Sequence, residues 1–182
     1  MTKYRIKDIC YSNKLNVKGI SKDVPIRYLD TSSLTDGTVS EYQNFILKDA
    51  PCRAQRLLEH DTIVYSMVRP NLCHYGYFER PDNDIVVSTG FITLSLNPKY
   101  GLLIDMKYLY LLLTQPKMTQ YLHSIAQNAV SSYPSLVPSD IENLVFDFPN
   151  YRKQLEISSI FFNIDRKIAL NREINRNLPL AA

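Results

Sequence analysis

Two carboxylates and a lysine in the middle of the chain have the outline of a metal-dependent nuclease motif. Asp82 follows a proline, and Asp105 stands two residues before Lys107. That chemistry needs both carboxylates and the lysine on adjacent strands around a Mg²⁺ ion. The sequence instead places Asp105 at the start of a helix, which disfavours the geometry. A small metal-dependent nuclease stays an alternative interpretation of this loose motif.

Other patterns that could support catalysis or metal binding are weaker. Asn97-Pro98-Lys99-Tyr100 lacks the second proline of the Asn-Pro-Pro-Tyr motif with which amino-methyltransferases hold an extruded base, and no glycine-rich cofactor loop precedes it. The three cysteines and three histidines are scattered, and the adjacent Cys73 and His74 would point to opposite faces of a strand. We therefore expect a non-catalytic binding and assembly protein that holds neither a metal nor a cofactor.

The composition fits one folded domain with a nearly neutral body. The chain has 182 residues, of which 45% are hydrophobic, and carries a net charge of +3. The surplus lies in residues 151–182, which hold six Lys/Arg and three Asp/Glu. Massed basic charge of the histone kind is thus excluded, and any nucleic-acid contacts must be local or shared with a partner. Without a membrane span or a signal sequence, and with an odd number of scattered cysteines, we expect a cytoplasmic protein.

The sequence patterns predict mainly strands in the first half of the chain and mainly helices in the second, which together indicate an α+β fold. Strands are expected at residues 24–29, 62–68, 75–78, 84–88, 91–96 and 145–148, and Asp36-Gly37 predicts a tight turn. Helices are expected at residues 106–114, capped by Asp105, and at 116–127, opened by Pro116. Ser139 and Glu142 have the spacing of a capping box, which predicts a short helical turn. Residues 1–149 would form this mixed α/β domain.

Residues 150–182 predict a long helix that needs a helical partner. Residues 151–178 contain no glycine or proline, and at 1.5 Å per residue they would form a rod about 42 Å long. Asn171 occupies position a of a heptad repeat, where a polar residue typically fixes the register of a coiled coil. An amphipathic helix packed on its own domain is the alternative. The expected pairing residues, here called the heptad seam, are Ile157, Ile160, Phe161, Ile164, Ile168, Asn171, Ile174 and Leu178.

A serine-rich loop, a short turn, a strand ending in proline and a long helix follow one another near the C-terminus. The segments are Ser132-Tyr-Pro-Ser-Leu136, Val137-Pro-Ser-Asp-Ile141, Val145-Phe-Asp-Phe-Pro149, Gln154-Leu-Glu-Ile157 and Ile164-Asp-Arg-Lys-Ile168. This order resembles one half of the specificity subunit, HsdS, of a type I restriction–modification system. The resemblance extends more loosely over the upstream chain.

The resemblance implies a non-catalytic, DNA-binding target-recognition domain at residues 1–149 and a conserved spacer helix at 150–182. Each such domain reads one half of a bipartite site in double-stranded DNA. The partners would be an adenine methyltransferase subunit that uses S-adenosylmethionine and a restriction subunit that uses ATP. The chain stops after one half, either as a natural half-subunit or as a piece of a longer chain. We expect a homodimer through the helix, which would separate two half-sites by roughly twelve base pairs.

Base reading needs donors and acceptors on exposed loops, with arginine for guanine and asparagine or glutamine for adenine. The residues expected to contact DNA are Arg69, Asn71, His74 and Tyr75, then Gln127, Asn128, Ser131, Ser132 and Tyr133, and for phosphates Arg53, Arg56, Lys117 and Arg80. Alternatively, Arg69 pairs with a carboxylate such as Glu79, the serines cap their loop, and Arg53 and Arg56 form the solvated face of a short helix. An oligomerisation adaptor without DNA specificity is the second alternative function, beside the nuclease.

Overall fold

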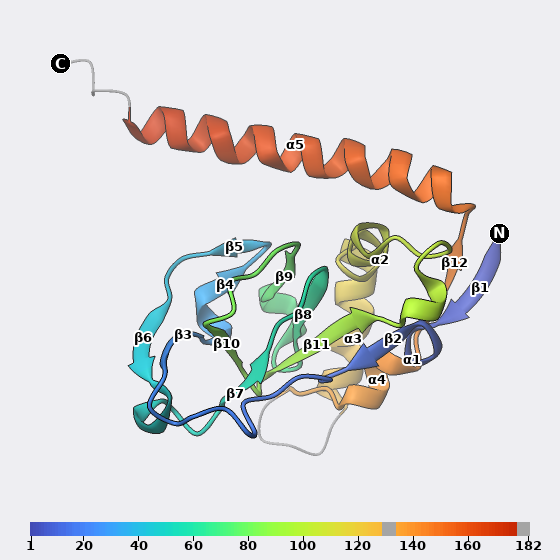
Figure 1. The fold of residues 1–182 in the computed structure, drawn as a ribbon. Helices are drawn as coiled ribbons and strands as arrows, with labels where there is room; N and C mark the ends of the chain where they lie inside the picture. Colours follow the sequence, from blue (N-terminus) through green and yellow to red (C-terminus); the bar gives the residue numbers. More distant parts are fainter. Residues whose placement is uncertain (129–133, 178–182) are drawn as a thin grey trace.

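Two four-stranded sheets form the centre of the fold (Figure 1). The structure, a computed structural model, describes residues 1–128 and 134–177, with side chains as far as residue 176. One sheet has the order β6-β3-β10-β7, and the other has the order β2-β11-β8-β9. The strands are β1 (Thr2–Arg5), β2 (Cys10–Ser12), β3 (Pro25–Leu29), β4 (Leu34–Thr35), β5 (Thr38–Val39), β6 (Gln43–Ile46), β7 (Ala54–Leu57), β8 (Thr62–Ser66), β9 (Tyr75–Phe78), β10 (Ile85–Ser88), β11 (Phe91–Leu96) and β12 (Val145–Phe148).

Strand β8 is the buried centre of the second sheet. All five of its residues are buried, and it pairs antiparallel with β9 and with β11. Its alternate side chains serve two cores, because Ile63 and Tyr65 face the cluster under the helices while Val64 faces the cluster beside the first sheet. The β-branched run thus behaves as a strand covered on both faces, as its continuous apolar character predicts.

The predicted strands and helices are confirmed to within two residues at each end. Asp36 and Gly37 both have positive φ, 46° and 73°, and join β4 to β5 as a tight hairpin turn. Asp105 caps the second helix by accepting the backbone N–H of Lys107 at 3.2 Å. The helices are α1 (Ile6–Ile9), α2 (Met106–Leu113), α3 (Pro116–Gln127), α4 (Pro138–Glu142) and α5 (Tyr151–Asn177), and the 3₁₀ turns are η1 (Thr31–Ser33), η2 (Leu47–Asp49), η3 (Pro70–Leu72) and η4 (Pro98–Tyr100).

The cap of α4 differs from the prediction. The helix begins at Pro138 rather than after Ser139, and the carboxylate of Asp140 accepts the backbone N–H of Val137 at 2.7 Å. Proline favours the first position of a helix because its missing N–H would have no partner there. The predicted pairing of Ser139 with Glu142 is therefore wrong by two residues at each end.

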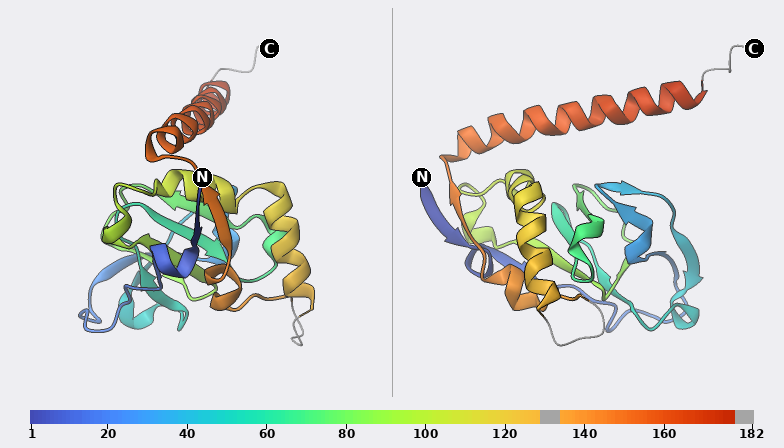
Figure 2. Two further views of the ribbon diagram at one scale, coloured as in Figure 1. Left: turned by 90° about the vertical axis from the view of Figure 1, so that its right-hand side faces the viewer. Right: turned by 180° about the vertical axis from the view of Figure 1, so that it is seen from behind.

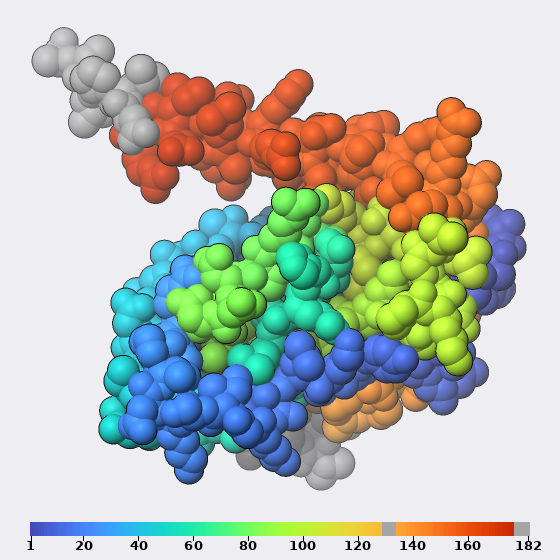
Figure 3. Space-filling view, in the orientation of Figure 1, coloured from blue at the N-terminus to red at the C-terminus, as the bar shows by residue number. Residues whose placement is uncertain are grey.

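The strand before α5 pairs with the N-terminal strand of the chain. β1 and β12 form an antiparallel ladder in which Thr2 faces Phe148 and Arg5 faces Val145. Asn150 then caps α5 by accepting the N–H of Lys153 at 2.9 Å. At 1.5 Å per residue, the 27 residues of α5 extend for about 40 Å. Figures 2 and 3 show α5 leaving the body of the molecule toward its C-terminal end. None of the described helices is long and apolar enough to cross a membrane.

Candidate nucleic-acid interface

Several predicted DNA contacts meet at one end of the sheets, opposite α5 in Figure 1. Backbone hydrogen bonds join neighbouring segments of the chain there. The carbonyl of Arg53 accepts from Thr89 N–H at 2.9 Å, Met67 N–H donates to Gly90 at 2.9 Å, and Arg69 N–H donates to Pro134 at 3.0 Å. We call this region, together with the turn η3 and the C-terminal end of α3, which packs against η3, the lower edge; it comprises residues 53, 66–72, 89–90, 127–128 and 134–136. It brings together segments that are up to about 80 residues apart in the sequence.

Arg69 and Asn71 lie exposed at the lower edge, on a turn with unusual backbone geometry. Arg69 and Cys73, which flank η3, are both left-handed, with φ of 47° and 55°. Such a conformation costs a non-glycine residue roughly 1–3 kcal/mol and is common at functional sites. Glu79, the carboxylate considered as a partner for Arg69, instead forms an ion pair with Lys107 at 2.9 Å. Arginine and asparagine, the residue types of Arg69 and Asn71, are those that read guanine and adenine.

Tyr75 was expected at the DNA surface, and the structure shows that this is wrong. The ring is 6% exposed and stacks on Tyr65 with 5.5 Å between ring centres. It also meets Tyr110 edge-on at 6.1 Å, and burial raises the pKa of its hydroxyl. The two tyrosines face each other across the β8–β9 ladder, so the aromatic pair belongs to the core.

His74 is half-buried and bound to the β4–β5 hairpin. Its Nδ1 lies 2.7 Å from the carbonyl oxygen of Leu34 and 3.1 Å from the hydroxyl of Thr35. One nitrogen of the ring is therefore occupied by the fold. His74 thus links the segment after η3 to the β4–β5 hairpin, and its role in reading bases stays a prediction.

Arg53 and Arg56 differ from their predicted setting. They bracket the start of β7 rather than lying on a short helix, and Arg53 is exposed at the lower edge. Arg56 is half-buried, and burial lowers the pKa of its guanidinium. Lys117 lies in the first turn of α3, and Arg80 follows the far end of β9, so neither joins Arg53.

Helix α3 brings the second predicted cluster to the same side. The helix packs against η3, and its C-terminal end lies at the bottom of the molecule in Figures 1 and 2. Gln127 and Asn128, at that end of the helix, are exposed. The predicted contacts Ser131, Ser132 and Tyr133 fall outside the described residues. The lower edge thus combines two arginines with three exposed amide side chains, from Asn71, Gln127 and Asn128.

A buried polar network, missed in the sequence, fixes the first turns of α5 to the body. The amide of Gln154 is fully buried; its oxygen accepts from Asp105 N–H at 2.9 Å, and its nitrogen donates to the carbonyls of Leu103 and Pro149, each at 2.8 Å. Ser158 donates to the carboxylate of Asp105. Sequence reasoning had no signal for these residues, because buried and exposed polar residues look alike in a helical pattern.

The side of α5 that meets the body is different from the heptad seam. Gln154, Ser158 and Phe162 form the side toward the body, and at 100° per residue the centre of the seam lies about 120° away. Its residues Ile160, Phe161, Ile164, Ile168 and Ile174 are 43–58% exposed. Leu178 lies outside the described residues. Apart from Ile157, which is half-buried, the described residues of the seam are therefore exposed rather than packed on their own domain.

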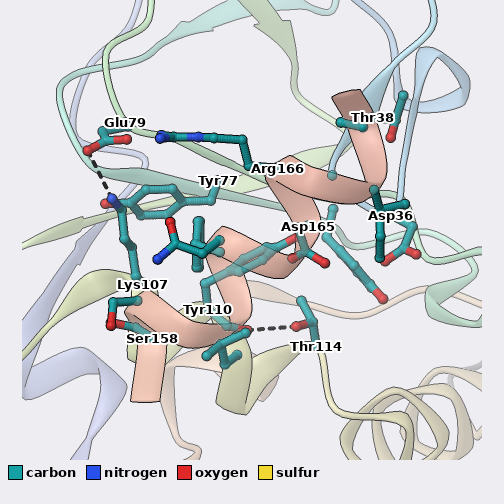
Figure 4. Close-up of a pocket in the computed structure, with 18 of the residues that line it drawn as sticks. Asp36, Thr38, Tyr77, Glu79, Lys107, Tyr110, Thr114, Ser158, Asp165 and Arg166 are labelled. Atoms are coloured by element: carbon teal, nitrogen blue, oxygen red, sulfur yellow. Dashed lines mark hydrogen bonds and ion pairs between the residues drawn. The ribbon is translucent and has the colours of Figure 1, made fainter. Parts of the chain in front are cut away.

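A cleft of about 730 Å³ lies between α5 and the body (Figure 4). Tyr75, Tyr77 and Tyr110 line its floor, and Phe162 reaches toward them from α5, with its ring 5.3 Å from that of Tyr77. The ammonium of Lys107 lies 5.3 Å from the centre of the Phe162 ring. This aromatic and cationic packing ends at Phe162, beyond which the described residues of α5 are exposed.

The residues of the nuclease alternative are each engaged in a structural contact. Asp82 pairs with Arg27 at 2.6 Å, Asp105 caps α2 and accepts from Ser158, and Lys107 pairs with Glu79. Among residues 1–128 and 134–177, no group of three or more His, Cys, Asp or Glu side chains could hold a metal ion. The Asn97–Tyr100 segment forms the turn η4, in which Asn97 accepts the N–H of Lys99.

The sequence matches the family model for the type I restriction modification DNA specificity domain over residues 1–180. A curated relative, the specificity subunit of the type I restriction enzyme HindI from Haemophilus influenzae, is 29% identical over 136 residues. That alignment covers 75% of this chain and 29% of the relative.

Solved structures share the fold. The HsdS subunit from Thermoanaerobacter tengcongensis superposes with a TM-score of 0.74 at 17% identity, over 95% of this chain and 44% of that one. A chain from work on assembly and conformational transition of the type I R-M system gives 0.73 at 20% identity, over 96% and 44%. The S subunit from M. genitalium gives 0.56 at 17% identity, over 94% and 41%. The chain spans less than half the length of each of these relatives.

Proposed function

Because the chain belongs to the family of type I restriction–modification DNA specificity domains, we propose that it recognises one half of a bipartite site in double-stranded DNA. The observation that carries this proposal is the lower edge. Arg53, Arg69, Asn71, Gln127 and Asn128 are all exposed there, and hydrogen bonds of the backbone hold the two arginine-bearing segments together. Arginine and amide side chains on a fixed backbone are what reading of base edges in the major groove requires.

In this proposal the chain catalyses nothing itself. It would recruit an adenine methyltransferase subunit and, with it, a restriction subunit. S-adenosylmethionine, ATP and Mg²⁺ would be bound by those partners. The proposal agrees with the structural engagement of Asp82, Asp105 and Lys107, which leaves no acid–base pair among the described residues of the nuclease motif.

The heptad seam would pair with the equivalent helix of a second copy of this chain. Its exposed isoleucines lie away from the body, and Asn171 would fix the register of the pair. A two-fold dimer would place two lower edges on DNA at a set distance, so its site would be a palindrome interrupted by a spacer.

The test is to recover the tagged chain from its native cells and to map methylated adenines with and without its gene. We expect an adenine methyltransferase subunit in the purified material, and one bipartite methylated motif that disappears when the gene is deleted. A chain carrying Asn71→Ala and Gln127→Ala should lose the motif, whereas Gln120→Ala with Lys99→Ala, both at exposed sites outside the lower edge, should keep it. Self-association alone, with unchanged methylation after deletion, would favour the adaptor.

A further inference from the structure

A basic hollow of about 650 Å³ lies beside the lower edge. One wall is the arc of residues 13–22, which is fixed at both ends. Val17 N–H donates to Gln55 at 3.0 Å, and the carbonyl of Lys22 accepts from Lys48 N–H at 2.9 Å. The residues beneath the arc come from η2, β7 and Thr89. The hollow is therefore built from three segments of the fold rather than from one loose loop.

The charges that line the hollow have one sign. Lys18, Lys22, Lys48 and Arg56 line it, and no acidic residue is among its lining residues in the described chain. Lys48 pairs with Asp23 at 2.9 Å, outside the lining, whereas within the described residues Lys18 and Lys22 form no ion pair. With Lys48 paired to Asp23, the cations of Lys18, Lys22 and Arg56 remain around one concave surface, where they attract an anion and raise its local concentration.

Arg56 supplies a buried donor without a partner. Its Nη1 atom is shielded from solvent and has no hydrogen-bond acceptor among the described residues. A buried donor left unpaired destabilises a fold, and an arginine in that state is best satisfied by a carboxylate or phosphate oxygen. The lining contains no carboxylate, so the acceptor for this donor would be a water molecule or an oxygen of a bound anion.

The amide side chains of the hollow are already used by the fold. Asn13 accepts the N–H of Thr93 at 3.1 Å, Asn16 accepts the N–H of Lys18 at 2.9 Å, and Gln55 donates to the carbonyl of Cys52 at 2.6 Å. Each contact engages one of the two polar groups of the amide and so restricts how that side chain can turn toward a base. The hollow is therefore suited to bind negative charge and poorly suited to select a sequence.

The hollow is continuous with the lower edge through Thr89. This residue lines the hollow, and its N–H donates to the carbonyl of Arg53, which belongs to the edge. Figure 1 shows the arc of residues 13–22 along the same lower side of the molecule, away from α5. A duplex lying on the edge would bring its backbone past the opening.

We infer, on the basis of the DNA-binding function proposed above, that this hollow binds the sugar-phosphate backbone of DNA flanking the half-site. Lys18 and Lys22 each neutralise a phosphate, and Arg56 donates to a phosphate oxygen from the floor. The contact is independent of base sequence and fixes the orientation of the domain on the duplex, while the lower edge reads the bases.

The experiment measures binding of the full chain to two fluorescent duplexes, one holding the mapped methylation motif and one scrambled, over a range of salt concentrations. Lys18→Gln with Lys22→Gln should reduce the slope of log affinity against log salt by about 1.8, because each lost phosphate contact removes about 0.9. At 0.1 M salt this corresponds to roughly 60-fold weaker binding of both duplexes. Lys3→Gln with Lys99→Gln removes the same charge at exposed positions outside the hollow and should leave the slope unchanged.

Arg56→Gln, which keeps a polar side chain, should weaken both duplexes equally without changing the preference between them. A Lys18/Lys22 variant that keeps the wild-type slope, or a control pair that loses as much, would overturn the inference while leaving the proposed function in place. Failure of the wild-type chain to prefer the motif duplex would count against the proposed function instead.

Discussion

Replacing Gln154 by leucine should break the hydrogen bonds that hold the first turns of α5 to the body, and the protein should lose much of its stability. The side chain is fully buried and makes three hydrogen bonds, one accepted from Asp105 N–H and two donated to the carbonyls of Leu103 and Pro149. Leucine has a similar size and makes none of them. Each stranded polar group costs about 1–3 kcal/mol, and the added apolar burial offsets about 1.5 kcal/mol. For three such groups the net loss in the free energy of unfolding should be about 1.5–7.5 kcal/mol, a large part of the ~5–15 kcal/mol typical of a domain.

The assay is urea unfolding at neutral pH, followed by circular dichroism at one fixed protein concentration, because any dimer would make stability depend on concentration. Gln120→Leu is the matched control, since this glutamine is exposed on α3 and should change stability by no more than about 0.5 kcal/mol. A loss below about 1 kcal/mol for Gln154→Leu would refute the reasoning, because the three groups would then have found other partners. If the leucine variant does not fold, Gln154→Asn gives a milder step in the same direction.

Four further outcomes are expected. Arg69→Ala should weaken binding to the motif duplex by about 1–3 kcal/mol and relax the preference at one base position, measured by binding selection; an unchanged preference would exclude Arg69 from base reading. Ile164→Asp should convert a dimer into monomers in sedimentation, and a persisting dimer would place the interface outside the heptad seam. Tyr75→Ala should lower the free energy of unfolding by about 3–5 kcal/mol; a stable variant with altered DNA preference would restore Tyr75 as a DNA contact. Asp84→Asn should destabilise the fold at neutral pH, because Arg27 holds the pKa of this carboxyl below its usual value. That difference should vanish in urea titrations as the pH falls below about 3.9 and through the lowered pKa, and a difference that grows on acidification would contradict it.

Local patterns predicted most elements, because they depend on neighbours in the sequence. The β-branched run at β8 and the cap at Asp105 act within a few residues, and both are found in the structure. The pairing of β1 with β12 joins residues more than 140 positions apart, and nothing in either short segment specifies it. Tyr75 was assigned to the surface because tyrosine suits both settings, and its partner Tyr65 is adjacent only across the ladder.

The sequence allowed us to predict which types of residue would contact DNA, but not how the fold arranges them into one surface. Arg69, Asn71 and Gln127 follow from the chemistry of base reading, and the structure places them on one side. The basic hollow could not be predicted, because Lys18 and Lys22 are four residues apart, a spacing that also fits one face of a helix, whereas they lie in an arc held by backbone hydrogen bonds to β7 and η2. Only the folded chain brings Arg56 beneath them.

The attachment of α5 by its first turns makes the helix a lever. The described hydrogen bonds and ring contacts between α5 and the body end at Phe162, so about fifteen residues, or roughly 22 Å, extend beyond the last of them, where α5 only borders the cleft. A tilt of about 10° at the root would move the free end by about 4 Å, which exceeds the ~3.4 Å rise of one base pair. A small change in packing around Gln154 and Ser158 would therefore move the C-terminal end of α5 by more than the rise of one base pair. In a dimer, the distance between the two recognition surfaces would change by a similar amount.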